Sequence, residues 1–284
     1  MEKLAEGYGL VEGPLWVPGR GLLYSDVLGG GVFCLDLEDN FDVVFEHRRG
    51  IGGMSLHAEG GVVVSGRNIG YKPFDGGDTV TLLERDEAAG LVGFNDITAD
   101  AAGRIYAGGL GASPVFEDGR EPAAGDLWLI DLDGSARVVG RDVRLTNGLG
   151  FSPDGKILYH SDSRRQAVMS YPVLPNGDLG EKTTFAVSER GVPDGLVVSE
   201  DGRVWVALAG GGAGVSVFGA DGKEVDFIAI PQPMCTSVCF GGDDLKDLYV
   251  VSGSDGMDSD RAGAVYRCRT DVAGLEVPLA RVAL

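Results

Sequence analysis

The chain has 284 residues, enough to bury a large core, and it carries 43 Asp and Glu against 24 Lys and Arg, a formal net charge of −19. This charge repels phosphate groups, so we predict a small-molecule partner and neither nucleic acid nor an anionic membrane. The amino terminus "MEKLAEGYGL" lacks a signal pattern and no stretch approaches 18 apolar residues, so we expect a cytoplasmic protein.

Taken along the chain, six segments share one layout: a short apolar run, a glycine-containing turn, and a β-rich run that ends in small residues. They read "EGPLWVPGRGLLYSD", "MSLHAEGGVVVSG", "NDITADAAGRIYAGG", "NGLGFSPDGKILYHSD", "DGLVVSEDGRVWVALAG" and "TSVCFGGDDLKDLYVVSG". The 47 glycines fit this layout, because tight turns between short strands need backbone conformations that glycine adopts readily.

A third strand is expected after each segment, in "VFCLDL", "TVTLLER", "DLWLIDL", "VMSYPV", "GVSVFG" and "AVYRCR". The unit recurs at intervals of about 40 to 50 residues, which is typical of propeller blades. No window has a clear helical period, which argues against an α/β fold. We therefore predict one domain over residues 1–284, an all-β six-bladed propeller with four-stranded blades around a central channel. A pair of β-sandwiches is the alternative.

Polar residues open four of the six inner strands: Glu12 in "EGP", Asn95 in "FND", Asn147 in "TNG" and Asp194 in "PDG". The first strand of each propeller blade lines the channel, so these side chains should converge near the axis although they are distant in sequence. Each of these short motifs is also an ordinary turn sequence. Their occurrence at the same phase of a repeat favours a common site.

Two carboxylates and two amides form an oxygen-only donor set, which suits a divalent cation. Ca²⁺ is the ion we favour, with Zn²⁺, Mn²⁺ and Mg²⁺ as alternatives. The histidines His47, His57 and His160 do not share a repeat phase, which argues against a histidine-ligated zinc site. The four cysteines lack CxxC spacing and are expected to be free thiols.

The same residues carry a resemblance to a known family. "EGPLW", the "FND" segment, "TNGLGFSPDGKILYHSDS", "PDGLVVSEDGRVWVA" and "TSVCFGGDDLKDLYV" together resemble the gluconolactonase/regucalcin (senescence marker protein) family, nearly from end to end. This resemblance implies a six-bladed, calcium- or zinc-dependent lactonase. It implies metal ligands at Glu12, Asn147 and Asp194, a substrate or metal contact at Asn95, and an acid/base role for Asp194.

Two positions depart from the family pattern. Sugar-lactone members carry an Arg where this chain has Gly93, and a loop Glu near the position of Ser113. With Asn95 and Asp96, these positions are our candidates for substrate contact, and Asp96 could instead orient its neighbour or bond local backbone. Losing an Arg and a carboxylate removes partners for sugar hydroxyls, so we expect a lactone less polar than a sugar lactone.

We therefore predict a metal-dependent hydrolase that opens a lactone or related cyclic ester with metal-activated water, and Asp194 as the acid/base. An organophosphate or ester hydrolase on the same centre is one alternative, and a calcium-binding propeller without enzymatic activity is another. A metal-independent synthase or lyase is a third. The chain contains no GxSxG, P-loop or GxGxxG motif. No feature of the sequence predicts an oligomeric state.

Overall fold

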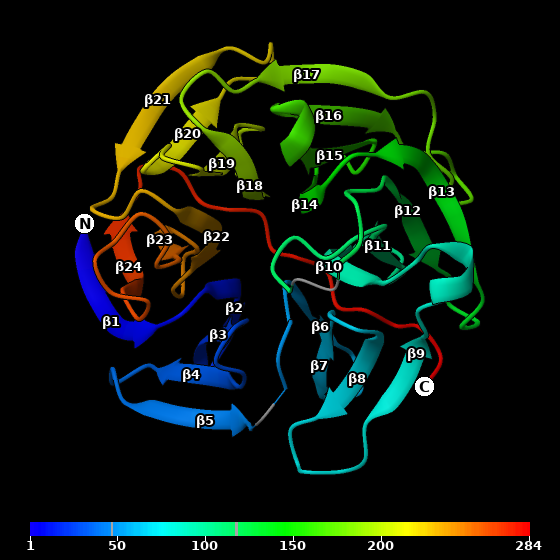
Figure 1. Ribbon diagram of the computed structural model, residues 1–284, viewed down its shortest axis with the longest axis horizontal. Coiled ribbons are helices and arrows are strands. Elements are labelled where there is room, and N and C mark those ends of the chain that lie inside the picture. Colours follow the sequence, from blue (N-terminus) through cyan, green and yellow to red (C-terminus); the bar gives the residue numbers. More distant parts are fainter. Residues whose placement is uncertain (47, 117–118) are drawn as a thin grey trace.

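The computed structural model describes residues 1–46, 48–116 and 119–284. These residues form six antiparallel sheets of four strands each. Figure 1 shows the sheets arranged in sequence order as blades around a central axis. The predicted six-bladed propeller is confirmed.

The blades are numbered along the chain. Blade 1 consists of β2 (Val11–Val17), β3 (Gly21–Asp26), β4 (Val32–Asp36) and β5 (Phe41–Phe45). Blade 2 consists of β6 (Met54–His57), β7 (Gly61–Val64), β8 (Ile69–Pro73) and β9 (Val80–Leu83). Blade 3 consists of β10 (Gly93–Ala99), β11 (Ile105–Leu110), β12 (Gly125–Ile130) and β13 (Ala136–Val143).

The other three blades follow the same order. Blade 4 consists of β14 (Thr146–Phe151), β15 (Ile157–Asp162), β16 (Ala167–Pro172) and β17 (Thr183–Val187). Blade 5 consists of β18 (Val192–Val198), β19 (Val204–Ala209), β20 (Gly214–Phe218) and β21 (Glu224–Ala229). Blade 6 consists of β22 (Cys235–Gly241), β23 (Asp247–Ser252), β24 (Gly263–Arg269) and the amino-terminal strand β1 (Glu2–Tyr8). Single 3₁₀ turns occur at Glu87–Ala89 (η1) and Ser163–Arg165 (η2).

The ring is closed by the amino terminus. Strand β1 pairs antiparallel with β24, from Glu2 opposite Arg267 to Tyr8 opposite Gly263. The two ends of the propeller therefore share one sheet, which closes the ring of blades. The Tyr8 hydroxyl also hydrogen-bonds the Tyr24 hydroxyl of blade 1 at 2.7 Å, which ties blade 6 to blade 1.

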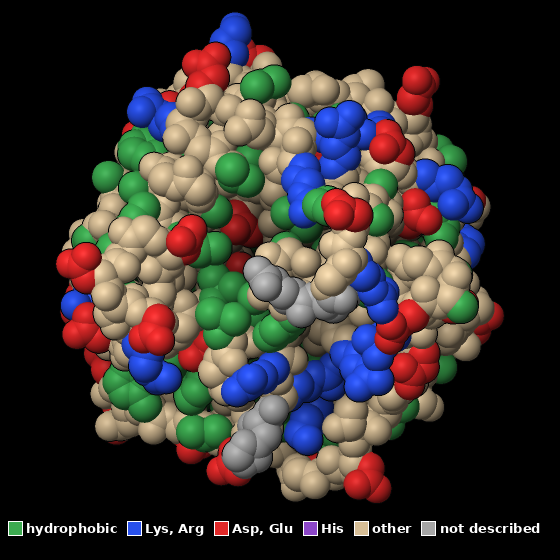
Figure 2. Space-filling view, in the orientation of Figure 1, with side chains coloured by type: hydrophobic (Ala, Val, Ile, Leu, Met, Phe, Trp, Pro, Cys, Tyr) green, Lys and Arg blue, Asp and Glu red, His purple; other side chains and the backbone are tan. Residues whose placement is uncertain are grey.

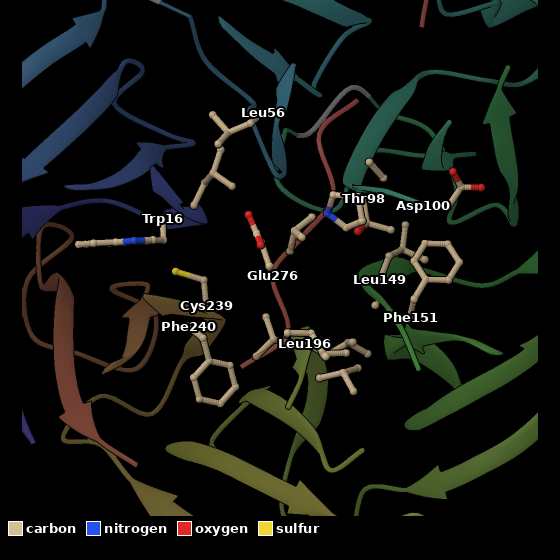
Figure 3. A pocket seen from close by; sticks show the side chains of 18 of the residues that line it. Trp16, Leu56, Thr98, Asp100, Leu149, Phe151, Leu196, Cys239, Phe240 and Glu276 are labelled. Carbon is tan, nitrogen blue, oxygen red and sulfur yellow. The ribbon is translucent and has the colours of Figure 1, made fainter. Parts of the chain in front are cut away.

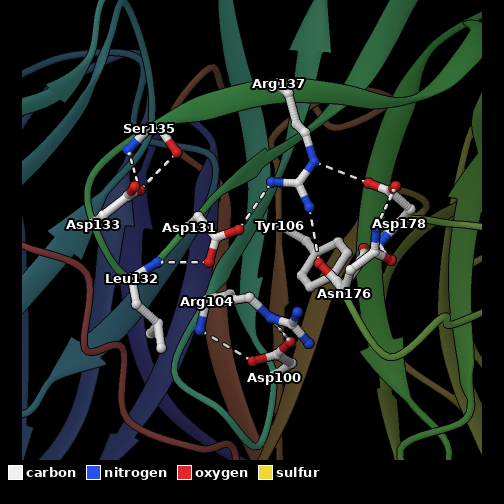
Figure 4. A network of polar contacts seen from close by, with 11 residues as sticks. Asp100, Arg104, Tyr106, Asp131, Leu132, Asp133, Ser135, Arg137, Asn176 and Asp178 are labelled. Atoms are coloured by element: carbon white, nitrogen blue, oxygen red, sulfur yellow. Dashed lines mark hydrogen bonds and ion pairs between the residues drawn. The ribbon is translucent and has the colours of Figure 1, made fainter.

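Neighbouring blades are joined by apolar packing and by polar contacts. Between blades 4 and 5, for example, Tyr159 packs in one buried cluster with Leu196 and Val206. Figure 4 shows a polar link between blade 3 and the β16–β17 connection of blade 4. There Arg137 pairs with Asp131 and Asp178, both at 2.9 Å. Burial between blades explains why the inner strands contain nearly continuous apolar runs rather than clean alternation.

The structure corrects the strand assignment in blade 2. The "TVTLLER" segment, predicted as the third strand, contains the fourth strand, β9. The third strand is β8 (Ile69–Pro73), a segment for which the sequence analysis predicted no strand. Its sequence "IGYKP" contains Gly and Pro, which are depleted in strands, but its pairing with β7 and burial of Ile69 and Tyr71 override that preference. Among the described residues, no helix has the length and apolar character needed to cross a bilayer.

Candidate metal centre at the propeller axis

The predicted residues meet at the axis. Glu12, Asn95, Asp96, Asn147 and Asp194 come from four inner strands, and we call them the axial cluster. Its three carboxyl groups lie close enough to influence one another electrostatically. Asn95 donates from Nδ2 to Oδ1 of Asn147. Figure 2 shows acidic side chains at the bottom of a hollow in the centre of one face.

A β-bulge occurs at each cluster residue: Asn95, Asp96, Asn147 and Asp194 lie within a bulge, and Glu12, still paired with Ser25, directly precedes one. The pairing of the inner strand with its neighbour shifts just at the cluster: between Glu12 and Leu15, Phe94 and Ile97, Thr146 and Leu149, and Pro193 and Leu196. A bulge leaves residues outside the ladder and redirects their side chains. The repeated bulge therefore presents polar side chains where a regular strand would continue its alternation.

Glycine follows three of the cluster residues because the inner strands approach one another closely there. A Cβ on Gly148 would lie 2.2 Å from the Leu196 nitrogen, and one on Gly195 would lie 2.0 Å from Oγ of Ser237. These contacts are far inside van der Waals distance, so a side chain at either position would force the strands apart. In "TNG", Gly148 thus permits close packing of the inner strands, and Asn147 extends toward the axis.

The amide of Asn147 has a fixed orientation. Ser163 donates its hydroxyl proton to the Pro193 carbonyl at 2.6 Å, so its oxygen accepts a hydrogen bond from Asn147 Nδ2 at 2.7 Å. This leaves Asn147 Oδ1 to face the cluster. The sequence analysis did not identify Ser163. The signal that could have found it is its position directly after the "HSD" at the end of a strand.

Asn95 directs the nitrogen of its side-chain amide, rather than the oxygen, toward Asn147. Its Nδ2 donates to Asn147 and to the Thr146 carbonyl at 2.9 Å, while Oδ1 lies against Gly52. In this arrangement Asn95 positions Asn147. Rotation of the amide by 180° would bring its oxygen beside Asn147 Oδ1, an arrangement that a cation between the two oxygens would stabilise.

The carboxyl groups are buried without compensating positive charge. Oδ1 of Asp194 is buried and has no hydrogen-bond partner among the described residues. Burial, followed by the charges of Asp194 and Asp96, raises the pKa of Glu12 well above its usual value. Burial and then the Asp96 charge likewise raise the pKa of Asp194, and burial raises the pKa of Asp96 to about 7. A bound cation would supply the missing positive charge.

The residues fit an oxygen-coordinated cation that uses amide oxygens. Among the described residues, no three His, Cys, Asp or Glu side chains gather closely enough to hold a metal ion by themselves. Glu12, Asp194 and Asn147 offer carboxylate and amide oxygens, the donors that Ca²⁺ and Mg²⁺ prefer. The unpartnered Asp194 oxygen and the fixed Asn147 oxygen are the observations that favour this fit.

Two further aspartates hold the segments that lead into the cluster. Asp26, at the end of β3, accepts from the backbone of Gly9 and Leu10 just before β2. Asp162, at the end of β15, does the same for Arg144 and Leu145 just before β14. Both aspartates accept hydrogen bonds from the backbone that leads into an inner strand. They thereby help to position Glu12 and Asn147.

Gly93 has no side chain, and the oxygen of the Ser113 hydroxyl is used in a local turn. The Gly93 strand lies against Gly66, whose carbonyl oxygen would be 2.9 Å from a Cβ on Gly93. The Ser113 hydroxyl oxygen accepts from the backbone nitrogens of Val115 at 3.3 Å and Phe116 at 2.9 Å, which closes a local turn.

The remaining candidate groups lie outside the cluster chemistry. His57 contacts the Val282 carbonyl and His160 contacts the Thr146 hydroxyl, while His47 lies outside the described residues. All four cysteines are free, as predicted. Cys235 lies near the cluster, but burial and the neighbouring acidic charges raise its thiol pKa, which opposes nucleophilic behaviour.

The chain matches the model of a known protein family along most of its length. The family model described as the SMP-30/Gluconolactonase/LRE-like region matches residues 10–254. The chain belongs to this family. It is 32% identical to a 6-deoxy-6-sulfogluconolactonase of Pseudomonas putida, with 95% of this chain and 94% of the relative covered. It is 31% identical to a pentonolactonase of Haloferax volcanii (93% and 92% covered) and 29% identical to regucalcin of Xenopus laevis (93% and 92%).

Solved structures show the same fold. A luciferin-regenerating enzyme superposes with a TM-score of 0.87 at 23% identity, covering 99% of both chains. A regucalcin from Agrobacterium tumefaciens, described as a calcium-binding protein, gives 0.86 at 22% identity, with 99% of this chain and 97% of that chain covered. Membership of a family that contains named lactonases supports a lactone-hydrolysing function.

Proposed function

We propose that the protein is a divalent-cation-dependent lactonase whose reaction centre is the axial cluster. The observation that carries this proposal is the buried, unpartnered Asp194 carboxylate oxygen, which meets a second buried carboxylate and a fixed amide oxygen. Uncompensated buried charge is costly, so such a group is retained where a ligand or a reaction uses it. Lactonase relatives at 31% and 32% identity support the reaction class.

Glu12, Asn147 and Asp194 would hold the cation, for which Ca²⁺ is our first choice. When bound, it would polarise the ester carbonyl and lower the pKa of water. Asn95 holds the Asn147 amide in place and, after rotation of its own amide, could add a fourth oxygen. Asp96, the remaining buried carboxyl group, would orient these groups or contact the substrate.

Asp194 is the group we assign to proton transfer. Its carboxylate would take a proton from the water that attacks the lactone carbonyl, and would return it to the ring oxygen as the acyl–oxygen bond breaks. The product is a hydroxy acid, and one water is consumed. Glu12 and Asn147 would act by holding their oxygens in place, a role that requires their buried, hydrogen-bonded setting.

The substrate we propose is a lactone with fewer hydroxyl groups than a sugar lactone. Gly93 provides no side chain, and Ser113 is engaged in its own turn. Neither position therefore supplies the charged hydrogen-bonding group that would distinguish a polyol from an alkyl chain.

The test is a substrate panel on protein stripped with a chelator and reloaded separately with Ca²⁺, Zn²⁺, Mn²⁺ or Mg²⁺. Simple aliphatic lactones, glucono-1,5-lactone, aryl esters and a phosphotriester are compared by kcat/KM. We expect no turnover after stripping, recovery on reloading, and aliphatic lactones at least as good as glucono-1,5-lactone.

Each other outcome contradicts a defined part of the proposal. Preference for glucono-1,5-lactone overturns the substrate assignment alone, and preference for the phosphotriester overturns the reaction class. Turnover that survives the chelator overturns the cation requirement. Tight cation binding with no turnover of any substrate indicates a calcium-binding propeller instead.

A further inference from the structure

A second cavity, of about 950 Å³, opens at the other end of the propeller axis. From blade 1 to blade 6 the blades run anticlockwise in Figure 1, whose orientation Figure 2 shares, and clockwise in Figure 3. Figure 3 therefore shows the face opposite to that of Figure 2. Its wall is formed by inner-strand residues that follow the axial cluster along each blade. Large apolar side chains line it: Trp16, Leu56, Leu149, Phe151, Leu196 and Phe240. A cavity of this size and lining is typical of small-molecule sites.

The carboxy-terminal segment, residues 273–283, forms a strap across this mouth. Leu275 N donates to the Val198 carbonyl in blade 5 at 3.0 Å, and Ala280 N donates to the Leu56 carbonyl in blade 2 at 2.8 Å. The residues between these anchors line the cavity, and Val277 and Leu279 are 44% and 41% exposed. Figure 3 shows the Glu276 side chain in the central opening.

The lining is strongly acidic. Among the described residues, Arg104 is the one basic side chain in it, and it pairs with Asp100 at 2.6 Å (Figure 4). Asp96, Asp243 and Glu276 line the same cavity without a basic partner in it. Asp96 is only 9% exposed, and no described residue forms a hydrogen bond or ion pair with its carboxylate. A large apolar cavity with carboxylates at its inner end and at its mouth repels anions and favours cations.

We propose that this cavity is a second ligand-binding site, for an apolar organic molecule that carries one positive charge, such as an alkylammonium. The apolar walls would bury its apolar part. Asp96 at the inner end and Glu276 on the strap would supply the opposite charge. The site opens on the face of the propeller opposite to the lactonase centre, and the two share only Asp96 among the residues of the axial cluster.

The test is calorimetric titration of the full chain, saturated with Ca²⁺, using octyltrimethylammonium as the probe. Octanol and octyl sulfate serve as neutral and anionic probes of the same chain length. We expect one saturable site for the cation, weaker binding of octanol, and no binding of octyl sulfate. Equal binding of all three, or none by the cation, would overturn the proposal.

Variants on the exposed strap locate the site without disturbing the core. Glu276→Gln should weaken binding about 2- to 5-fold, the loss expected for one partly exposed charge pair. Val277→Lys places a positive charge at the mouth and should weaken binding further. Val225→Lys, at a 57% exposed position on outer strand β21, is the matched control and should bind as the unmodified protein does.

Competition with Ca²⁺ separates this site from the axial cluster. If the probe binds only to protein stripped with a chelator and is displaced when Ca²⁺ is restored, it binds at the axial carboxylates and the second site is refuted. Unchanged binding in Val277→Lys refutes it as well. Because the readout is binding, failure of the lactonase assay has no bearing on this result.

Discussion

At the residue scale, the axial cluster combines groups that are unfavourable when considered singly. Asp194 and Glu12 are buried beside Asp96, so each carboxylate opposes the ionisation of the others. Asn147 cannot relieve this by rotation, because Ser163 fixes its amide. The divalent cation that we propose would neutralise the buried carboxylates and use the fixed Asn147 oxygen as a ligand.

Substitution of Asp194 by Asn should test this directly. Asn keeps the shape but removes one negative charge and the proton acceptor, so we expect cation affinity to fall at least about 100-fold and turnover to be lost. Isothermal titration with Ca²⁺ and a lactone assay give the two readouts. Asp42→Asn, at an exposed position in blade 1, is the control, and full activity in Asp194→Asn would contradict the assigned role.

The sequence was sufficient to predict which residues form the cluster but not how their side chains are oriented. Glu12, Asn95, Asn147 and Asp194 share a repeat phase, and a propeller makes that phase a place near the axis. The direction of the Asn95 amide and the role of Ser163 depend on contacts between blades, which a pattern along one strand does not contain. The cation-binding and catalytic roles of all these residues stay predictions.

At the element scale, the bulged inner strands depend on glycine for their close approach. Gly148→Ala should destabilise the protein by about 1 to 3 kcal/mol, because the added carbon would meet the Leu196 nitrogen at 2.2 Å. Denaturant unfolding measures this. Gly219→Ala, where the nearest atoms lie at 3.4 Å, should change stability much less. Equal effects of the two substitutions would argue against close packing of the inner strands.

A second element-scale prediction concerns β15, where burial lowers the pKa of His160 to about 4 from 6.5. Between these values the unfolded chain binds one more proton than the folded chain, so stability rises with pH over this window and is lost as the pH falls through it. The free energy of unfolding of the unmodified protein, relative to His160→Gln, should rise by about 3 kcal/mol from pH 4 to pH 7. Groups common to both proteins cancel in this difference. A difference independent of pH would show that His160 does not titrate this way.

Strand assignment shows where sequence patterns fail at this scale. Five of the six expected third strands lie where their β-rich runs predict, but "IGYKP" of β8 was hidden by its Gly and Pro. Its pairing partners and its burial, rather than its own composition, make it a strand. The fourth strand of blade 6 comes from the other end of the chain, a pairing that no local pattern contains.

At the scale of the whole molecule, closure by β1 couples the blades into a ring. Each interblade cluster buries residues from two neighbouring sheets, and β1 joins the last blade to the first part of the chain. The sequence predicted one domain over residues 1–284, and this coupling leads us to expect one cooperative unfolding transition. Far-ultraviolet circular dichroism and tryptophan fluorescence should give coincident denaturant curves. Separate transitions would indicate independently folding parts.

The central claim is that oxygens from Glu12, Asn147 and Asp194 surround one divalent ion on the propeller axis. A crystal structure of protein stripped with a chelator and soaked in Mn²⁺, with anomalous scattering recorded, tests it most directly. We expect a single strong anomalous peak within coordination distance of all three side chains, and its loss in Asp194→Asn crystals. A peak elsewhere, or none at the axis, would show that these side chains do not form the cation site.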